Sequence, residues 1–146
     1  MTKRTIYELA GGEATFFALV ERFYHGVAED PLLRPMYPAD DLKESQRKLA
    51  LFLIQYFGGP TTYSEERGHP RLRLRHAPFP IDQAARDAWL HHMNAALDAT
   101  PLPEAAREEM RRYFAHAATF LINRAAPATL PVFPLQPRLP HEQNPI

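Results

Sequence analysis

The chain of 146 residues contains no cysteine, which excludes disulfides, thiolate metal ligands and a thiol nucleophile. Its 17 basic and 17 acidic side chains cancel, so no overall field draws it toward nucleic acid or an anionic membrane. No apolar run follows Lys3 and Arg4, and no stretch approaches the roughly 18 consecutive apolar residues of a membrane span. We therefore expect one cytoplasmic domain without a membrane span.

Credible strand patterns are also lacking, and apolar residues instead recur at the three- and four-residue spacing of amphipathic helices. Thr5 and Asp82 are good helix caps, and the predicted helices begin near residues 6, 13, 40, 82 and 104. Leu32 to Tyr37 is predicted to form a short, tight helix between prolines. The pattern predicts an all-α domain. The larger residues expected on its buried faces are Phe23, Tyr24, Leu42, Leu49, Phe52, Tyr56, Trp89, Tyr113 and Phe120.

One long segment, Gly58 to Pro80, lacks helical periodicity and is rich in basic residues: Arg67, His69, Arg71, Arg73, Arg75 and His76. Loops of this length in compact domains are often functional. A neutral imidazole binds transition metals and haem iron, whereas guanidinium groups bind carboxylates or phosphates. Haem, with its iron and two propionates, fits both. From these residues alone, two alternatives stay open, a basic surface loop without a ligand and a patch that binds nucleic acid or phosphate.

The composition changes near the C-terminus, where prolines stand at 127, 131, 134, 137, 140 and 145. Proline at this density cannot continue a helix and favours extended segments. We therefore divide the chain into a helical domain, residues 1–124, and an extended or disordered tail, residues 125–146. Apolar side chains in the tail leave a homodimer open.

Several sequence blocks, taken together and in this order, resemble the group II truncated haemoglobins. They include Met36-Tyr37-Pro38, Phe57-Gly58-Gly59-Pro60, Arg67-Gly68-His69-Pro70, Arg75-His76-Ala77-Pro78-Phe79 and Arg86-Asp87-Ala88-Trp89-Leu90. The resemblance extends from about Thr5 to Asn123. It implies a truncated globin-like fold, a two-over-two helical sandwich around one haem b.

The resemblance also implies roles for individual residues. His76 matches the proximal iron ligand, and Tyr24, Tyr37 and Trp89 match distal hydrogen-bonding groups. The remaining positions that it places near haem are Ser45, Leu49 and Phe52 on the distal helix, and Lys48, Tyr63 and Arg75, the candidates for propionate contacts. Without the resemblance, Tyr24 and Trp89 would be interpreted as core residues and Ser45 as bonded to its own helix.

Three polar donors around one diatomic ligand would slow its release, since each hydrogen bond in a dry site contributes about 1 to 3 kcal/mol. The resemblance thus implies a protein that binds dioxygen, carbon monoxide or nitric oxide and suits nitric oxide dioxygenation, peroxide reduction or sensing. No flavin or nicotinamide domain is recognisable, so turnover would require a separate reductase. The alternative is a haem-free module that binds nucleic acid or phosphate through its basic loop, although zero net charge and the lack of interleaved aromatics argue against it.

Overall fold

The chain folds into helices throughout the part that the computed structural model describes, residues 4–37, 42–71, 76–77, 79 and 81–123. The elements in order are α1 (Ile6–Ala10), α2 (Glu13–Ala28), the 3₁₀ helix η1 (Arg34–Met36), α3 (Lys43–Tyr56), α4 (Thr62–Arg67), α6 (Gln83–Ala99) and α7 (Glu104–Phe120). These residues contain no strand, in agreement with the predicted all-α class. None of the described helices has the length and apolarity required to cross a membrane.

The ends of two helices follow directly from their capping residues. Thr5 and Glu8 form a reciprocal capping box at α1, with the Glu8 N–H donating to Thr5 Oγ1 at 3.1 Å. Gly11, with φ of 110°, ends α1 in the left-handed region that glycine adopts without strain. At α6 the Ala85 N–H donates to Asp82 Oδ1 at 2.9 Å. Both predicted caps are confirmed.

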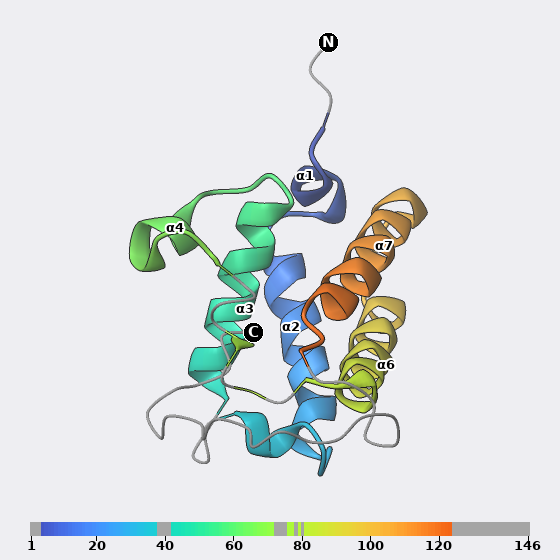
Figure 1. Cartoon of the computed structure of the whole chain (residues 1–146). Coiled ribbons are helices and arrows are strands. Elements are labelled where there is room, and N and C mark those ends of the chain that lie inside the picture. The colour runs from blue at the N-terminus through green and yellow to red at the C-terminus, as the bar shows by residue number, and fades with distance from the viewer. Residues whose placement is uncertain (1–3, 38–41, 72–75, 78, 80, 124–146) are drawn as a thin grey trace.

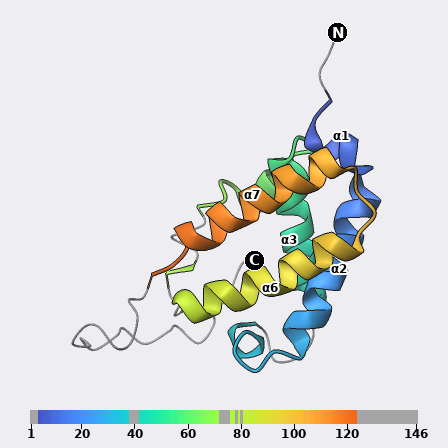
Figure 2. The same cartoon turned by 90° about the vertical axis from the view of Figure 1, so that its right-hand side faces the viewer.

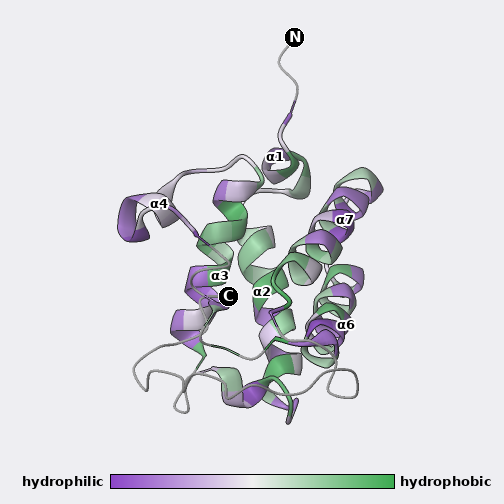
Figure 3. Cartoon of the chain, viewed as in Figure 1, coloured by the Kyte–Doolittle hydropathy of each residue, from purple (hydrophilic) through white to green (hydrophobic). Residues whose placement is uncertain are grey.

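The core lies between α2 and the helices packed around it. Figures 1 and 2 show α2 beside α3 and α6, with α7 lying against α6, and the contacts between these elements agree. The inward face of α2 carries Phe16, Val20, Phe23 and Val27, all fully buried. Most hydrophobic residues lie toward this centre, whereas hydrophilic residues lie on the outer faces of α4, α6 and α7 (Figure 3). Burial of these large side chains is the main stabilising contribution.

The prediction that residues 58–80 lack structure of their own is wrong, because α4 lies within them. Tyr63 is fully buried there, and its ring packs edge-on against Phe52 of α3 at 5.5 Å between centroids. Gln55 of α3 fixes Ser64 twice, accepting from its N–H at 2.9 Å and donating to its hydroxyl at 2.7 Å. One short helix of this kind is stabilised by contacts with α3, and it is too short to show periodicity.

Three expectations for α3 and α7 also need correction. Tyr56 and Phe120 were expected on buried faces, yet they are 55% and 52% exposed. Both lie at the last residue of their helix, beyond the neighbours that cover the rest of each face. Tyr56 instead packs its ring at 4.1 Å from that of Tyr113. Helix α3 begins at Lys43, later than predicted, and residues 40–41 lie outside the described part.

Asp30 joins the turn after α2 to helix α6. Its Oδ2 lies 2.7 Å from Nε2 of His92, and its Oδ1 accepts from the N–H groups of Leu32 and Leu33 at 2.8 and 3.3 Å. Burial, the largest single effect, raises the pKa of Asp30, but the hydrogen bonds from His92 and the two N–H groups together outweigh it. The pKa of Asp30 is therefore lowered, which means that its charged form stabilises the fold.

We expect Asp30→Asn to lower the free energy of unfolding at pH 7 by about 1 to 2 kcal/mol, because a charged acceptor is lost. A carboxyl with a lowered folded pKa stabilises above its unfolded pKa of about 4, and this contribution disappears as the pH falls through the folded value. Urea unfolding should show the full difference at pH 7 and a shrinking one below about pH 4. Asp98→Asn, at an exposed ion pair with Arg111, is the control and should change little. A pH-independent difference would contradict this role.

Candidate functional site

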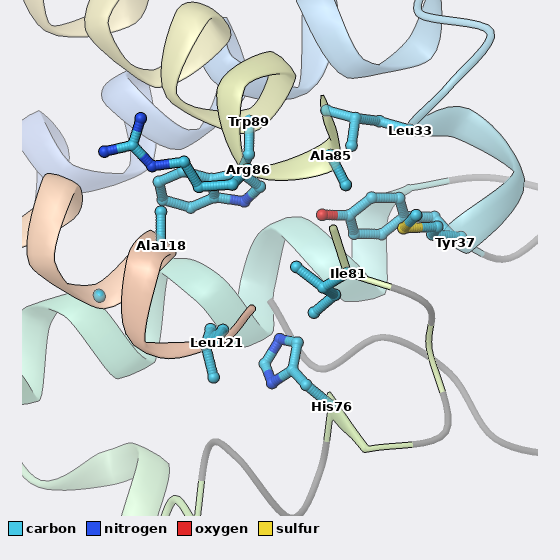
Figure 4. Close-up of a pocket in the computed structure, with 11 residues that line it drawn as sticks. Leu33, Tyr37, His76, Ile81, Ala85, Arg86, Trp89, Ala118 and Leu121 are labelled. Carbon is cyan, nitrogen blue, oxygen red and sulfur yellow. The ribbon is translucent and has the colours of Figure 1, made fainter. Parts of the chain in front are cut away.

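A largely apolar pocket opens between η1, α6, the C-terminal part of α7 and the segment 76–81 (Figure 4). The space between protein atoms in and around this pocket is about 460 Å³, a figure that includes open solvent at its mouth. Its lining residues are Leu33, Met36, Tyr37, His76, Ile81, Ala85, Arg86, Trp89, Ala117, Ala118 and Leu121. The small alanines of α6 and α7 leave the space that larger side chains would fill. A mainly apolar pocket with a few polar groups is the usual form of a cofactor site.

His76 supplies the polar group on one side of this pocket. The residue is only 2% exposed, and its imidazole points from the segment 76–81 into the space (Figure 4). Its Nε2 is buried, and within the described part of the chain that atom makes no hydrogen bond. The Phe79 N–H donates to the His76 carbonyl at 2.9 Å and closes a tight turn behind the ring. An imidazole held in this way fits the axial ligand of an iron porphyrin.

Tyr37 and Trp89 face His76 from the other side of the pocket. In Figure 4 the Tyr37 hydroxyl and the Trp89 indole nitrogen both point toward the central space. Tyr24 lies behind them, with its ring 5.4 Å from that of Tyr37 in an edge-on arrangement. Phe23 packs 5.1 Å from the Trp89 ring and holds the indole in place. The residues predicted as a donor group are thus brought together in space.

The electrostatics of this group keep its hydroxyls protonated. Burial most strongly raises the pKa of Tyr24, and the neighbouring Tyr37 raises it further. Burial also raises the pKa of Tyr37, although the nearby Tyr24 hydroxyl and Trp89 indole partly oppose this. The Tyr24 hydroxyl is fully buried. At neutral pH both phenols therefore retain a proton that can be donated to a ligand.

The other predicted site residues are not among the described residues that line the pocket. Ser45, Leu49 and Phe52 are buried on α3, but none of them is among the described residues that line the pocket. Lys48 is half-buried on the same helix, and Tyr63 is buried on α4. Arg75 lies outside the described residues. The expected contacts of these six residues with a cofactor therefore stay predictions.

Several pocket residues were missed by the sequence reasoning. Leu33 and Ile81 line the pocket from non-helical segments, where no periodicity identifies a buried position. Arg86 contributes only the aliphatic part of its side chain, because its Nε donates to the Thr119 hydroxyl at 3.1 Å and its guanidinium points away from the pocket (Figure 4). The short segment between Phe79 and Asp82 could have suggested Ile81, since a lone apolar residue before a helix cap is commonly buried.

An all-helical domain with a buried histidine opposite phenol and indole groups across an apolar pocket fits a globin-type protein. Comparison with known proteins agrees, since the bacterial-like globin family profile matches residues 5–123. Group 2 truncated hemoglobin YjbI of Bacillus subtilis is 45% identical over 77% of this chain and 85% of its own length. The chain therefore belongs to the bacterial-like globin family, as a group II truncated haemoglobin.

Solved structures give the same result for the fold. The haemoglobin of Chloroflexus aurantiacus is 58% identical, with a TM-score of 0.81 over 84% of this chain and all of its own. A structure described as a truncated oxygen-avid haemoglobin from Bacillus subtilis is 44% identical, with a TM-score of 0.78 over 82% of this chain and all of its own. The predicted truncated globin fold is confirmed, and these haemoglobin relatives imply haem as the cofactor.

Proposed function

We propose that the protein binds one haem b with His76 as the axial ligand and takes up dioxygen, carbon monoxide or nitric oxide on the side of Tyr37 and Trp89. The observation that carries this proposal is the placement of these three side chains around one apolar pocket (Figure 4). The absence of cysteine supports a haem held without thioether bonds. When bound, haem supplies an iron centre that binds diatomic ligands and exchanges electrons.

The chain's own residues then determine how tightly a ligand is held. The Tyr37 hydroxyl and the Trp89 indole would donate hydrogen bonds to a diatomic ligand that acquires partial negative charge, with Tyr24 as a reserve donor. Each such bond in a dry site contributes about 1 to 3 kcal/mol. The apolar lining from Leu33, Ile81 and the α7 residues excludes the water that would compete for these donors. High affinity and slow release follow, in keeping with the oxygen-avid relative from Bacillus subtilis.

Other residues would position the cofactor. Lys48 and Arg75 have the charge to meet the propionates, and Tyr63 is a weaker candidate for the same contact. Ser45, Leu49 and Phe52 share the inner side of α3, so we propose that they contact the distal face of the ring. The domain assignment belongs to the same proposal, with a globin domain at residues 1–124 and a tail at residues 125–146 that contributes little to haem binding.

A protein that releases oxygen slowly is poorly suited to bulk transport and better suited to chemistry with the bound ligand. This site favours two reactions, nitric oxide dioxygenation and peroxide reduction, and would also suit a sensor of diatomic ligands. Turnover in the first two requires electrons from a separate reductase.

We expect the oxygenated ferrous protein to consume one equivalent of nitric oxide in a single rapid turnover and to yield nitrate and the ferric form. The donors retain oxygen long enough for the second ligand to arrive, which is the physical reason for this expectation. Rapid mixing with visible absorbance, followed by nitrate analysis, measures both products. Oxygen release that outpaces this reaction, with nitrite as the main product, would contradict the dioxygenase assignment.

A further inference from the structure

Asn123 joins the C-terminal end of α7 to the segment that carries His76. It lies three residues beyond Phe120, the last residue of α7. Its Nδ2 donates to the carbonyls of His76 and Phe79 at 3.2 and 2.9 Å. Its Oδ1 accepts from the Ile81 N–H at 2.9 Å, and its own N–H donates to the Ile81 carbonyl at 2.8 Å. One residue thus makes four hydrogen bonds to three positions of this segment.

The chemistry of this arrangement is specific to a short primary amide. An asparagine side chain offers two N–H donors and one carbonyl acceptor at the same distance from the backbone. Here both donors and the acceptor face backbone groups of the segment 76–81. An aspartate has nearly the same shape but no donor at neutral pH, so it would place a negative oxygen against the carbonyls of His76 and Phe79. A serine is smaller and can donate only one hydrogen bond.

We propose that Asn123 is a positioning residue that sets the orientation of the His76 imidazole toward the haem iron; this inference rests on the proposed function. The main chain is held at the carbonyls of His76 and Phe79, and at both the N–H and the carbonyl of Ile81. Outer partners that bond directly to a ligating side chain commonly contribute about 10- to 100-fold to metal affinity or activity. Asn123 acts through the main chain of His76, so we expect an effect at the lower end of this range.

The same contacts couple His76, the proposed axial ligand, to the wall of the pocket. Ala117, Ala118 and Leu121 of the α7 end line the pocket together with Ile81 and His76. Because Asn123 lies only three residues beyond the end of α7, its hydrogen bonds connect the histidine segment to the wall formed by α7. Loss of the amide donors would let the imidazole tilt while the wall stayed in place. The expected result is a weaker and more heterogeneous bond between iron and histidine.

We expect Asn123→Asp to lose haem about tenfold faster than the parent protein, measured by transfer to a haem-scavenging apomyoglobin. In resonance Raman spectra of the ferrous protein, the iron–histidine stretching band should shift and broaden. The band is the decisive readout, because a residue that only stabilised the end of α7 would lower the melting temperature and leave the band in place. The melting temperature of the haem-free protein is measured alongside to separate the two effects.

Two truncations provide the matched comparison. A chain ending at Arg124 keeps Asn123 and should match the full chain in band position and haem loss. A chain ending at Ile122 removes Asn123 and should reproduce the effect of Asn123→Asp. If Asn123→Asp does not fold, Asn123→Ser carries the test and should give an intermediate shift.

The inference is wrong if the folded variants that lack the amide retain the parent band, whatever their rate of haem loss. A full chain that binds no haem would instead overturn the proposed function on which this inference rests. The two failures are therefore distinguishable, because only the second one affects the unmodified protein.

Discussion

His76→Ala is expected to lose haem on the order of 100-fold faster than the parent protein and to lack the five-coordinate ferrous spectrum. The reason is that His76 provides the imidazole of the pocket. Even the loss of a residue that only hydrogen-bonds to a metal ligand commonly lowers metal affinity or activity by about 10- to 100-fold. Haem transfer to a scavenging apoprotein, together with ferrous and carbonyl spectra, measures the effect. Added imidazole should partly restore the spectrum, since the substitution leaves a space where the ring lay.

The control for this experiment is His69→Ala. His69 belongs to the same basic segment but is exposed, and its Nδ1 accepts from the Arg71 N–H at 3.2 Å. Its removal should leave the spectra and the haem loss rate unchanged. Parent-like spectra for His76→Ala, or equal losses for the two variants, would show that the axial ligand has been assigned to the wrong residue.

Trp89→Phe should raise the rate of oxygen release from the ferrous protein by about tenfold or more. A lost hydrogen bond of about 1.4 kcal/mol corresponds to a factor of ten in rate. Phenylalanine keeps an aromatic ring between Phe23 and Phe114, which lie 5.1 and 5.7 Å from the Trp89 ring, so the substitution mainly removes the N–H donor. Stopped-flow displacement of oxygen by carbon monoxide measures the rate.

The competing interpretation of Trp89 is a large core residue without a role in ligand binding. In that case the variant would lose roughly 1 to 3 kcal/mol of stability and release oxygen at the parent rate. Tyr24 could reorient and replace the missing donor, because its buried hydroxyl lies close to that of Tyr37. Tyr24→Phe and the double variant are therefore measured too. If the double variant released oxygen at the parent rate, Trp89 would be a core residue without a role in ligand binding.

The sequence predicted most of the helical frame because local chemistry determines it. Thr5, Gly11 and Asp82 define helix ends through contacts within a few residues, and these contacts can be inferred from residue type and spacing. Helix α4 could not be inferred in this way, since its stability depends on Tyr63 packing against α3. The exposure of Tyr56 is likewise a matter of which neighbours reach the end of its helix.

The site was predictable only in part, for a related reason. His76 and Trp89 were identified through the resemblance to a family, because no spacing rule places residues of a loop and a helix on opposite sides of a pocket. The apolar lining from Leu33 and Ile81 depends on the tertiary fold. Asn123 carries no local signal at all, since its partners lie more than 40 residues earlier in the chain.

Membership of the globin family argues against the alternative of a haem-free module that binds phosphate through its basic segment. The family profile covers the whole helical domain, including the segment that contains His76. Burial of that histidine in an apolar pocket, with its ring turned away from the surface, favours a cofactor ligand over a solvent-exposed binding patch.

The visible spectrum of the full chain, titrated with haemin and then reduced, tests the central claim most directly. We expect saturation at one haem per chain, a pyridine haemochrome of the b type, and a five-coordinate ferrous form that binds carbon monoxide. The same titration of His76→Ala should give weaker binding without the five-coordinate ferrous form. A full chain that takes up no haem, or a His76→Ala variant with parent affinity and spectra, would contradict the account.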